Sequence, residues 1–376
     1  MANHLPETMR GQFLESFKRP YTLKSIPLPT PTTAHDILIK VDAASYCHTD
    51  YVLAQGQMPG FPKSFPTIGC HEFAGTVVSH SESPSTQATE FQVGDKVGVP
   101  GRAFHACGTC FECRGSKDPV SQDDKGYSVY CAHADNNGLS RDGGFAEYAI
   151  VDARQVAPIP SGMTAVEAAP LMCAGITIYA ALKRCQIQAG DRVGIMGAGG
   201  GLGHLGLQYA VKMGFKVLGV DAADAPLKLA TSLKTGAIIV DARTEKAADV
   251  VQQLGTEDGG KDIGEMGLDA VIILPESQQA FDYGMTLLKT HGKCVIVSFP
   301  ENGFHISARD VVFRDISIIG SLVGSNRMLR EMLDFSAAYG VKAISKAFAL
   351  DRLNDLVEDY HKGGGGKLVV DMSLRS

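Results

Sequence analysis

Four chemically active side chains stand in a row in the stretch SYCHTDYVLA, residues 45–54. Cys47 and His48 carry groups that can bind a metal, and the hydroxyl of Thr49 and the carboxylate of Asp50 can hold or pass protons. A single cysteine before a helix is more often a small core residue than a ligand. The stretch therefore needs partners elsewhere in the chain before it indicates a site.

Three further candidates are dispersed along the sequence: His71 and Glu72 in GCHEFAG, and Cys173 in LMCAG. A catalytic zinc has three protein ligands and one open position, and these ligands often come from distant segments that meet at the floor of a cleft. Each candidate taken alone is better explained as an ordinary core residue. Their spacing by itself does not select a catalytic site.

A second constellation is local. CGTCFEC contains Cys107, Cys110 and Cys113, with two residues between each cysteine and the next, and Cys131 follows. One tight turn can present several such thiolates to a zinc ion, and four cysteines make a closed, structural site. Buried free thiols are the alternative. A nucleic-acid-binding zinc finger is disfavoured, because its second half and a basic or aromatic face are both missing.

The segment GIMGAGGGLGHLGLQYAVKMG follows an expected strand and opens an expected helix. Gly197, Gly200 and Gly203 would allow a tight turn whose backbone N–H groups approach a pyrophosphate. The next strand ends at Asp221, where a carboxylate can bind ribose hydroxyls, and Asp224 adds a second negative charge that would repel a 2'-phosphate. The pattern predicts NAD(H) rather than NADP(H); the alternative is a glycine turn that serves packing only.

The elements that must position these residues change character along the chain. From about residue 20 to 160, short β-branched runs separated by Gly and Pro predict an irregular, mostly β domain. Polar inserts at 79–90 and 116–128 are expected as exposed loops. AAPLMCAGITIYAAL, residues 168–182, is expected to be helical.

Farther along, apolar strands begin at residues 192, 216, 237, 269 and 293 and alternate with amphipathic segments of helical length. This alternation predicts a doubly wound α/β domain with a parallel sheet covered on both faces. We assign residues 175–319 to this dinucleotide-binding domain. Residues 1–174 form the other domain, which residues 320–376 could rejoin through a helix and strands.

Composition limits the class of protein. The 376 residues are 44% hydrophobic and 20% charged with a net charge of -6, which is typical of a globular chain and does not suggest a nucleic-acid partner. No stretch of 18 apolar residues and no signal-peptide pattern is present, so we expect no membrane partner and a cytoplasmic location. The nine cysteines are then better explained as thiols or metal ligands than as disulfides.

The motifs CHTD, GCHEFAG, CGTCFEC, LMCAGITIYAAL, GAGGGLG and GVD occur in this order. Over about residues 25–372 the chain resembles the zinc-dependent medium-chain alcohol dehydrogenases, especially their yeast-type branch. The resemblance implies a GroES-like catalytic domain beside a Rossmann domain, NAD(H) as cofactor, one catalytic and one structural zinc per chain, and a homotetramer or homodimer.

By this resemblance, Cys47, His71 and Cys173 correspond to the catalytic zinc ligands. Glu72 corresponds to a carboxylate that can approach the metal as water or substrate exchanges. Asp50 corresponds to the acid that orients the imidazole of His71. The structural zinc would be held by Cys107, Cys110, Cys113 and Cys131.

The resemblance also implies a proton relay through Thr49 and a set of contacts with the cofactor. His48 and Lys367 would contact the pyrophosphate, and Thr177 the nicotinamide. The full set of implied cofactor-binding residues is His48, Thr177, Gly197, Gly200, Gly201, Leu202, Gly203, Asp221, Val297, Ser321, Val323 and Lys367.

Several positions depart from the family pattern. Val52 replaces a histidine that completes the proton path in yeast-type enzymes, and Pro226 replaces a ribose-binding lysine. Lys367 replaces an arginine and so loses a bidentate fork. These changes predict altered proton release and modest cofactor affinity.

The substrate is expected to be bulkier than ethanol. The chain has no tryptophan, whereas yeast-type ethanol enzymes narrow their pocket with two; Met58 matches one position, and the other falls near Arg102 and Ala103. We therefore predict hydride transfer between NAD(H) and a larger alcohol, aldehyde or ketone. The alternatives are a biosynthetic carbonyl reductase that works mainly from aldehyde to alcohol, and a non-catalytic nucleotide-binding protein.

Overall fold

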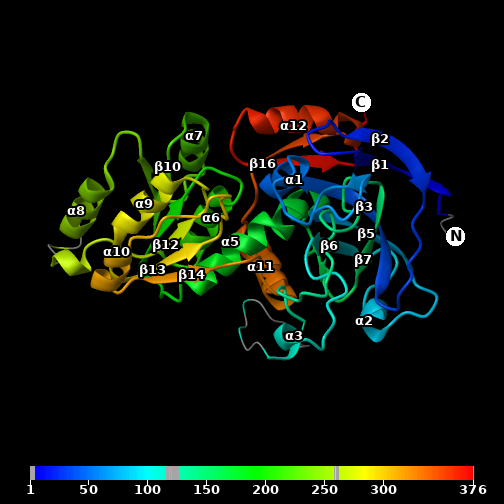
Figure 1. The fold of residues 1–376 in the computed structure, drawn as a ribbon, viewed down its shortest axis with the longest axis horizontal. Coiled ribbons are helices and arrows are strands. Elements are labelled where there is room, and N and C mark those ends of the chain that lie inside the picture. The colour runs from blue at the N-terminus through cyan, green and yellow to red at the C-terminus, as the bar shows by residue number, and fades with distance from the viewer. Residues whose placement is uncertain are drawn as a thin grey trace.

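The computed structural model describes residues 5–115, 118, 120, 127–257, 259 and 262–375. It has two domains that lie side by side, with both ends of the chain on the same domain (Figure 1). Most of the polar insert expected at 116–128 lies outside the described residues. The other insert, 79–90, contains the end of a strand and the short helix α2 (Thr86–Thr89).

The domain that holds both ends of the chain is built on antiparallel strands. A seven-stranded sheet has the order β15-β16-β3-β5-β6-β8, with β7 also paired to β3, and a three-stranded sheet has the order β2-β1-β4. Its strands are β1 (Thr8–Leu14), β2 (Thr22–Pro27), β3 (Asp36–Tyr46), β4 (Thr67–Ile68), β5 (Glu72–His80), β6 (Lys96–Pro100), β7 (Tyr148–Asp152), β8 (Ala157–Pro158), β15 (Ser345–Phe348) and β16 (Lys367–Asp371). Its other helices are α1 (His48–Ala54), α3 (Phe111–Gly115), α4 (Ala165–Ala168), η1 (Ala169–Met172), η3 (Leu350–Arg352) and α12 (Leu353–His361).

The second domain is a doubly wound sheet in the order β11-β10-β9-β12-β13-β14. All its strand pairs are parallel, and helices cover both faces. The strands are β9 (Arg192–Met196), β10 (Lys216–Asp221), β11 (Ile238–Asp241), β12 (Leu268–Ile273), β13 (Leu288–Ile296) and β14 (Ser317–Gly320). The helices are α5 (Ala174–Arg184), α6 (Gly203–Lys212), α7 (Asp224–Ser232), α8 (Ala247–Glu257), η2 (Ile263–Glu265), α9 (Gln278–Leu287), α10 (Ala308–Arg314) and α11 (Asn326–Tyr339).

The predicted fold class is confirmed, although one strand was missed. The five expected strands are β9 to β13, but the edge strand β14 has only four residues, Ser-Ile-Ile-Gly, and was not predicted. The C-terminal strands do join the first domain, because β16 pairs with β3. The domain boundaries at 174/175 and 319/320 remain our assignment; α11 packs against α5 of the parallel-sheet domain although it follows residue 319.

The helix expected over 168–182 is wrong as a continuous element. It is broken at Cys173, whose φ of -126° and ψ of -63° are not helical, so η1 ends at Met172 and α5 begins at Ala174. The two helices bend by 49° at this point. The break leaves Cys173 at a corner of the chain instead of on a helix face.

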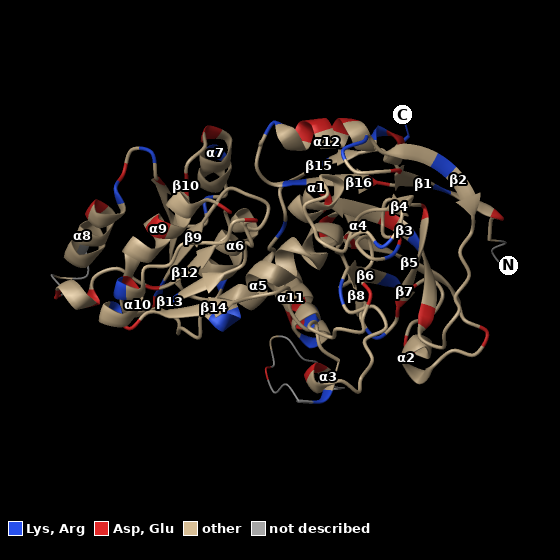
Figure 2. Cartoon of the chain, in the orientation of Figure 1, with Lys and Arg blue, Asp and Glu red and all other residues tan. Residues whose placement is uncertain are grey.

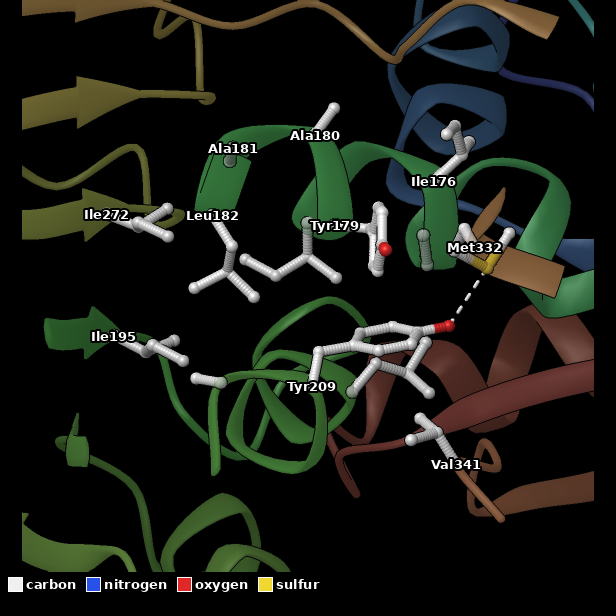
Figure 3. Close-up of a cluster of buried hydrophobic side chains, with 14 of the residues drawn as sticks. Ile176, Tyr179, Ala180, Ala181, Leu182, Ile195, Tyr209, Ile272, Met332 and Val341 are labelled. Atoms are coloured by element: carbon white, nitrogen blue, oxygen red, sulfur yellow. Dashed lines mark hydrogen bonds between the residues drawn. The ribbon is translucent and has the colours of Figure 1, made fainter. Parts of the chain in front are cut away.

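Helix α5 forms the centre of the largest core. Nine of its eleven residues are buried, as expected for a helix that is apolar all round. Figure 3 shows its Tyr179 and Leu182 facing Ile195 of β9 and Tyr209 of α6, and the Tyr209 hydroxyl donates to the Met332 sulfur of α11 at 2.9 Å. Because α5 directly follows Cys173, this packing fixes one side of the candidate site.

Charges of both signs are interspersed over both domains (Figure 2). Among the described residues no single helix is long and apolar enough to cross a membrane; the bent pair Ala165–Met172 and Ala174–Arg184 reaches that length and composition only jointly.

Candidate active site

Three side chains from separate segments meet beside a cleft. Their ligand atoms, the sulfurs of Cys47 and Cys173 and a ring nitrogen of His71, all lie within 4.8 Å of one another. The two sulfurs are 4.0 Å apart, close to the edge of about 3.8 Å expected for thiolates in a zinc tetrahedron. Cys47 precedes α1, His71 precedes β5, and Cys173 lies in the break before α5.

Asp50 holds two of these segments together. Its carboxylate is fully buried and accepts the backbone N–H of Cys47 at 2.9 Å and that of Cys70 at 3.0 Å. Its Oδ1 also lies 3.6 Å from Nδ1 of His71. One carboxylate therefore binds the backbone of both segments and lies beside the imidazole, while its role in orienting a metal-bound His71 stays a prediction.

The electrostatics suit a divalent cation. Neither ring nitrogen of His71 has a hydrogen-bond partner among the described residues, although the side chain is buried. Burial lowers the pKa of His71, but Asp50 and Cys47 outweigh burial and raise that pKa well above its ordinary value. A hydrogen bond from Cys173 lowers the pKa of the Cys47 thiol. A zinc ion bound here would replace protons on a soft, negatively charged donor set.

Glu72 is not part of this ligand group. Its carboxylate is completely buried, accepts the Ala174 N–H at 3.2 Å and forms an ion pair with the Lys367 ammonium. Lys367 is itself buried and also donates to the Tyr46 carbonyl at 2.9 Å. Burial raises the pKa of Glu72 to about 7, against the opposing effect of Lys367.

This ion pair bears on two predicted roles. Glu72 can approach the metal, and Lys367 can approach a pyrophosphate, only if the two side chains separate. Lys367 is also absent from the described residues that line the cleft, so its pyrophosphate contact stays a prediction.

The second cysteine group is closed. Cys107, Cys110, Cys113 and Cys131 form a ligand cluster, with sulfurs 3.7 Å apart for Cys107 and Cys131 and 3.9 Å apart for Cys110 and Cys131. These distances fit a zinc tetrahedron and are far longer than a disulfide bond of about 2.05 Å.

A cleft of about 500 Å³ runs from Cys47 and Cys173 to the glycine-rich turn. Among the described residues that line it are all the predicted cofactor-binding residues except Lys367, and the ligands Cys47 and Cys173. Phe299 and Leu322 also line it, whereas Met58, Arg102 and Ala103 do not. The contacts with a cofactor remain predictions, but the residues that would make them share one cavity.

The turn at the far end of the cleft requires glycine at two of the predicted positions. Gly197 has a φ of +79°, and a Cβ on Gly203 would lie 2.0 Å from the Gly197 carbonyl oxygen. The carboxylate of Asp221, at the end of β10, accepts the N–H of Gly199 at 3.0 Å and that of Ala222 at 2.8 Å. Asp221 therefore stabilises the turn through these hydrogen bonds and also lines the cleft.

One cation near this acid was not anticipated from the sequence. Asp221 lies beside Asp241 in the parallel pair β10–β11, and Arg243 follows two residues later. Its guanidinium is bound to Asp241 at 2.8 and 2.9 Å and to Asp224 at 2.6 Å. The order of the strands in the sheet would have been needed to predict that Arg243 lies here. Its positive charge is balanced by the carboxylates of Asp241 and Asp224.

Four polar side chains, Thr49, His48, Thr177 and Ser321, lie near the ligand group or along the cleft. The Thr49 hydroxyl lies 3.7 Å from the Cys47 sulfur. His48 is half exposed and bonds through Nδ1 to the Tyr360 hydroxyl at 2.6 Å. Thr177 and Ser321 line the cleft with buried hydroxyls that have no partner among the described residues, so both are available to a ligand.

Comparisons with known proteins agree with this arrangement. Residues 33–161 match the alcohol dehydrogenase GroES-like domain, and residues 201–338 match the zinc-binding dehydrogenase domain. An alcohol dehydrogenase of Moraxella sp. (strain TAE123) is 35% identical over 97% of this chain and all of its own, and one of Geobacillus stearothermophilus is 34% identical over 96% and 99%. The crystal structure of an alcohol dehydrogenase from Aeropyrum pernix superposes with a TM-score of 0.80 at 28% identity, over 96% of this chain and 99% of that one.

Proposed function

Because the chain belongs to the zinc-dependent medium-chain alcohol dehydrogenase family, whose members are oxidoreductases acting on small alcohols, we propose that it transfers hydride between NAD(H) and an alcohol, aldehyde or ketone bulkier than ethanol. The observation that supports this most strongly is that three zinc-type ligands and the predicted cofactor turn border the same cleft. Cys47, His71 and Cys173 would hold the catalytic zinc, and the other four clustered cysteines the structural zinc.

The two cofactors divide the chemistry. Zinc bound in this site would supply a Lewis acid that favours loss of the alcohol proton, and NAD+ would supply the hydride acceptor. The residues of the chain orient the substrate and move its proton. The Thr49 hydroxyl, beside Cys47, would accept the alcohol proton and in the same step donate its own proton toward solvent, and half-exposed His48, bonded to Tyr360, is the proposed end of that route. This route would serve in place of the histidine that Val52 replaces.

The preference for NAD(H) should depend on the charge of Asp221. Asp221→Asn keeps an oxygen that can accept the Gly199 N–H but removes the negative charge that favours ribose hydroxyls over a 2'-phosphate. We expect kcat/KM to fall about tenfold with NAD+ and to rise with NADP+. Steady-state kinetics with both cofactors measure the ratio of kcat/KM with NAD+ to kcat/KM with NADP+.

Asp355→Asn, an exposed carboxylate on α12, is the matched control and should leave the ratio unchanged. A wild-type chain that prefers NADP+ would contradict the assignment of the cofactor. An unchanged ratio in Asp221→Asn would contradict the role of the carboxylate.

The substrate class can be tested by size. The wall of the cleft includes Phe299 and Leu322, two apolar residues that are 58% and 45% exposed. Apolar surface of this kind favours a large apolar group on the substrate. We expect kcat/KM for benzyl or cinnamyl alcohol to exceed that for ethanol at least about tenfold, with the same order for the aldehydes. A preference for ethanol would refute this part of the proposal.

The overall function is tested by metal analysis of the purified protein together with oxidation of NADH by a panel of aldehydes. Two zinc ions per chain and turnover of bulky aldehydes are expected. One zinc ion and no turnover would mean that Cys47, His71 and Cys173 do not form a working site, and the protein would then be a non-catalytic nucleotide binder.

We also propose a homodimer or homotetramer. β14 is an edge strand of the parallel sheet, and the neighbouring helix α10 exposes Val312 and Phe313, which are 72% and 81% accessible. An open strand edge beside apolar side chains is a common association surface. Sedimentation of the purified chain as a monomer would contradict this assembly.

A further inference from the structure

His204 is a buried histidine that the proposed chemistry does not use. It is the second residue of α6, directly after Gly203 of the cofactor turn, and it is completely inaccessible to solvent. Its Nδ1 lies 2.9 Å from the Gly200 carbonyl, and its Nε2 lies 3.0 Å from the Ile344 N–H. Since the Ile344 amide can only donate, Nε2 must accept, and the ring proton must reside on Nδ1. Burial lowers the pKa of His204 to about 4, in agreement with a neutral ring.

The bond to Gly200 fixes one peptide of the cofactor turn. The Gly200 carbonyl accepts both the ring N–H of His204 and its backbone N–H, the latter at 3.1 Å. A trans peptide is planar, with its C=O and N–H pointing in opposite directions. Anchoring the Gly200 carbonyl on His204 therefore directs the Gly201 N–H away from the helix, toward the cleft that Gly201 lines. This is the group that a pyrophosphate at a helix N-terminus would meet.

The bond to Ile344 ties the same turn to the chain between the domains. Gln208, one helical turn beyond His204, binds both backbone groups of Lys342, donating to its carbonyl at 2.9 Å and accepting its N–H at 3.2 Å. His204 and Gln208 together hold residues 342–344, which connect α11 with β15. We call this contact the α6 clasp. Figure 1 shows α6 next to α5, close to the boundary of the two domains.

Behind the clasp, hydrogen bonds continue to the catalytic ligands. The Ile344 carbonyl accepts the Lys367 N–H at 2.9 Å, and the Lys367 side chain pairs with Glu72. Glu72 in turn accepts the N–H of Ala174, the residue after the ligand Cys173. A second contact joins Gly366 N–H to the Gly199 carbonyl at 3.3 Å. The cofactor turn and the metal ligands are thus connected through backbone that His204 holds.

We propose that His204 is a positioning residue for cofactor binding: it fixes the orientation of the Gly200–Gly201 peptide and holds the cofactor turn in register with the interdomain segment 342–344. This inference rests on the proposed use of NAD(H). It assigns His204 no contact with substrate, zinc or nicotinamide, so its loss should affect cofactor affinity much more than the chemical step.

Three substitutions separate the two bonds. His204→Leu removes both, His204→Asn keeps a donor near the Nδ1 position for Gly200, and Gln208→Leu removes clasp bonds to Lys342 without touching the Gly200 carbonyl. The measurements are the Kd for NADH by fluorescence titration, zinc content, Tm, and kcat at saturating cofactor. We expect His204→Leu to raise the Kd about tenfold, with two zinc ions retained and kcat changed less than threefold. His204→Asn should recover most of the affinity, and Gln208→Leu should lower Tm but keep the Kd within twofold of wild type.

A Kd for His204→Leu within twofold of wild type would overturn the proposal. So would a Gln208→Leu variant that loses as much affinity as His204→Leu, because the effect would then be general loosening of the domains. If His204→Leu does not fold, His204→Asn with wild-type stability and a tenfold higher Kd would also overturn it. Failure of the wild-type chain to bind NADH would instead refute the proposed function itself.

Discussion

Replacing Cys173 with alanine should leave a folded chain that holds one zinc ion instead of two and oxidises alcohols at least about a thousandfold more slowly in kcat/KM. Cys173 supplies one of three ligands, and its sulfur also holds the pKa of the Cys47 thiol down. With the sulfur removed, Cys47 and His71 are left as a two-ligand site that binds zinc weakly. The Lewis acid would be lost while the rest of the cleft persists.

The fold should survive this change because Cys173 lies in a break between helices and is only partly buried. Zinc per chain, circular dichroism and kcat/KM are the three measurements. Cys185→Ala is the matched control, since Cys185 is a buried cysteine at the other end of α5 and belongs to no ligand cluster among the described residues. Two retained zinc ions with unchanged activity in Cys173→Ala would show that the ligand set is assigned wrongly.

The second large effect is expected at the closed cysteine cluster. Cys113→Ala should also reduce the zinc content to one ion per chain, but it should act on stability, lowering Tm by about 10 °C. The small core of this lobe consists of the four cysteines with Ala103, Ala106, Ala134 and Tyr127, so little other apolar burial is available to hold it. Metal coordination would supply the stability that a larger hydrophobic core provides elsewhere.

Acid should weaken the same site in the wild-type chain. Burial raises the pKa of the Cys113 thiol to about 12, so without a metal this group is protonated at neutral pH. Zinc must displace that proton, and its affinity therefore falls as pH falls. Thermal unfolding with and without a chelator, at two pH values, measures the coupling. Val93→Ala, an exposed apolar position of the same domain, serves as control, and an unchanged Tm in Cys113→Ala would mean that the cluster is not a structural metal site.

Local sequence pattern was sufficient for the sheet and for the ligand types. Continuous apolar runs marked β9 to β13, and the spacing of the cysteines marked the closed cluster. The pattern failed where one residue departs from its neighbours: Cys173 follows Met172 and precedes Ala174, both good helix formers, yet its own φ and ψ are not helical and the helix breaks there. The four-residue strand β14 was too short to give a periodic signal.

Contacts between residues far apart in the chain also could not be predicted from the sequence. Glu72 and Lys367 are 295 positions apart, and nothing near either residue indicates an ion pair. Arg243 approaches Asp224 only because β10 and β11 are neighbours in the sheet. His204 looked like part of a glycine-rich helix start, and its role depends on residues 342–344, which belong to a different part of the fold.

The pairing of β16 with β3 has a consequence for how the chain is made. All strands of the parallel sheet lie between Arg192 and Gly320, and α11, which completes its core, ends at Tyr339, so that domain can compact once the chain to this point has left the ribosome. The sheet of the other domain is completed later. Because Tyr46 pairs with Leu368, this edge of β3 stays unpaired until the last residues are synthesised. Closing so long a loop is slow. Lys367 then reaches Glu72 at the same late step, so the parallel-sheet domain should be complete before the ion pair beside the proposed metal ligands forms.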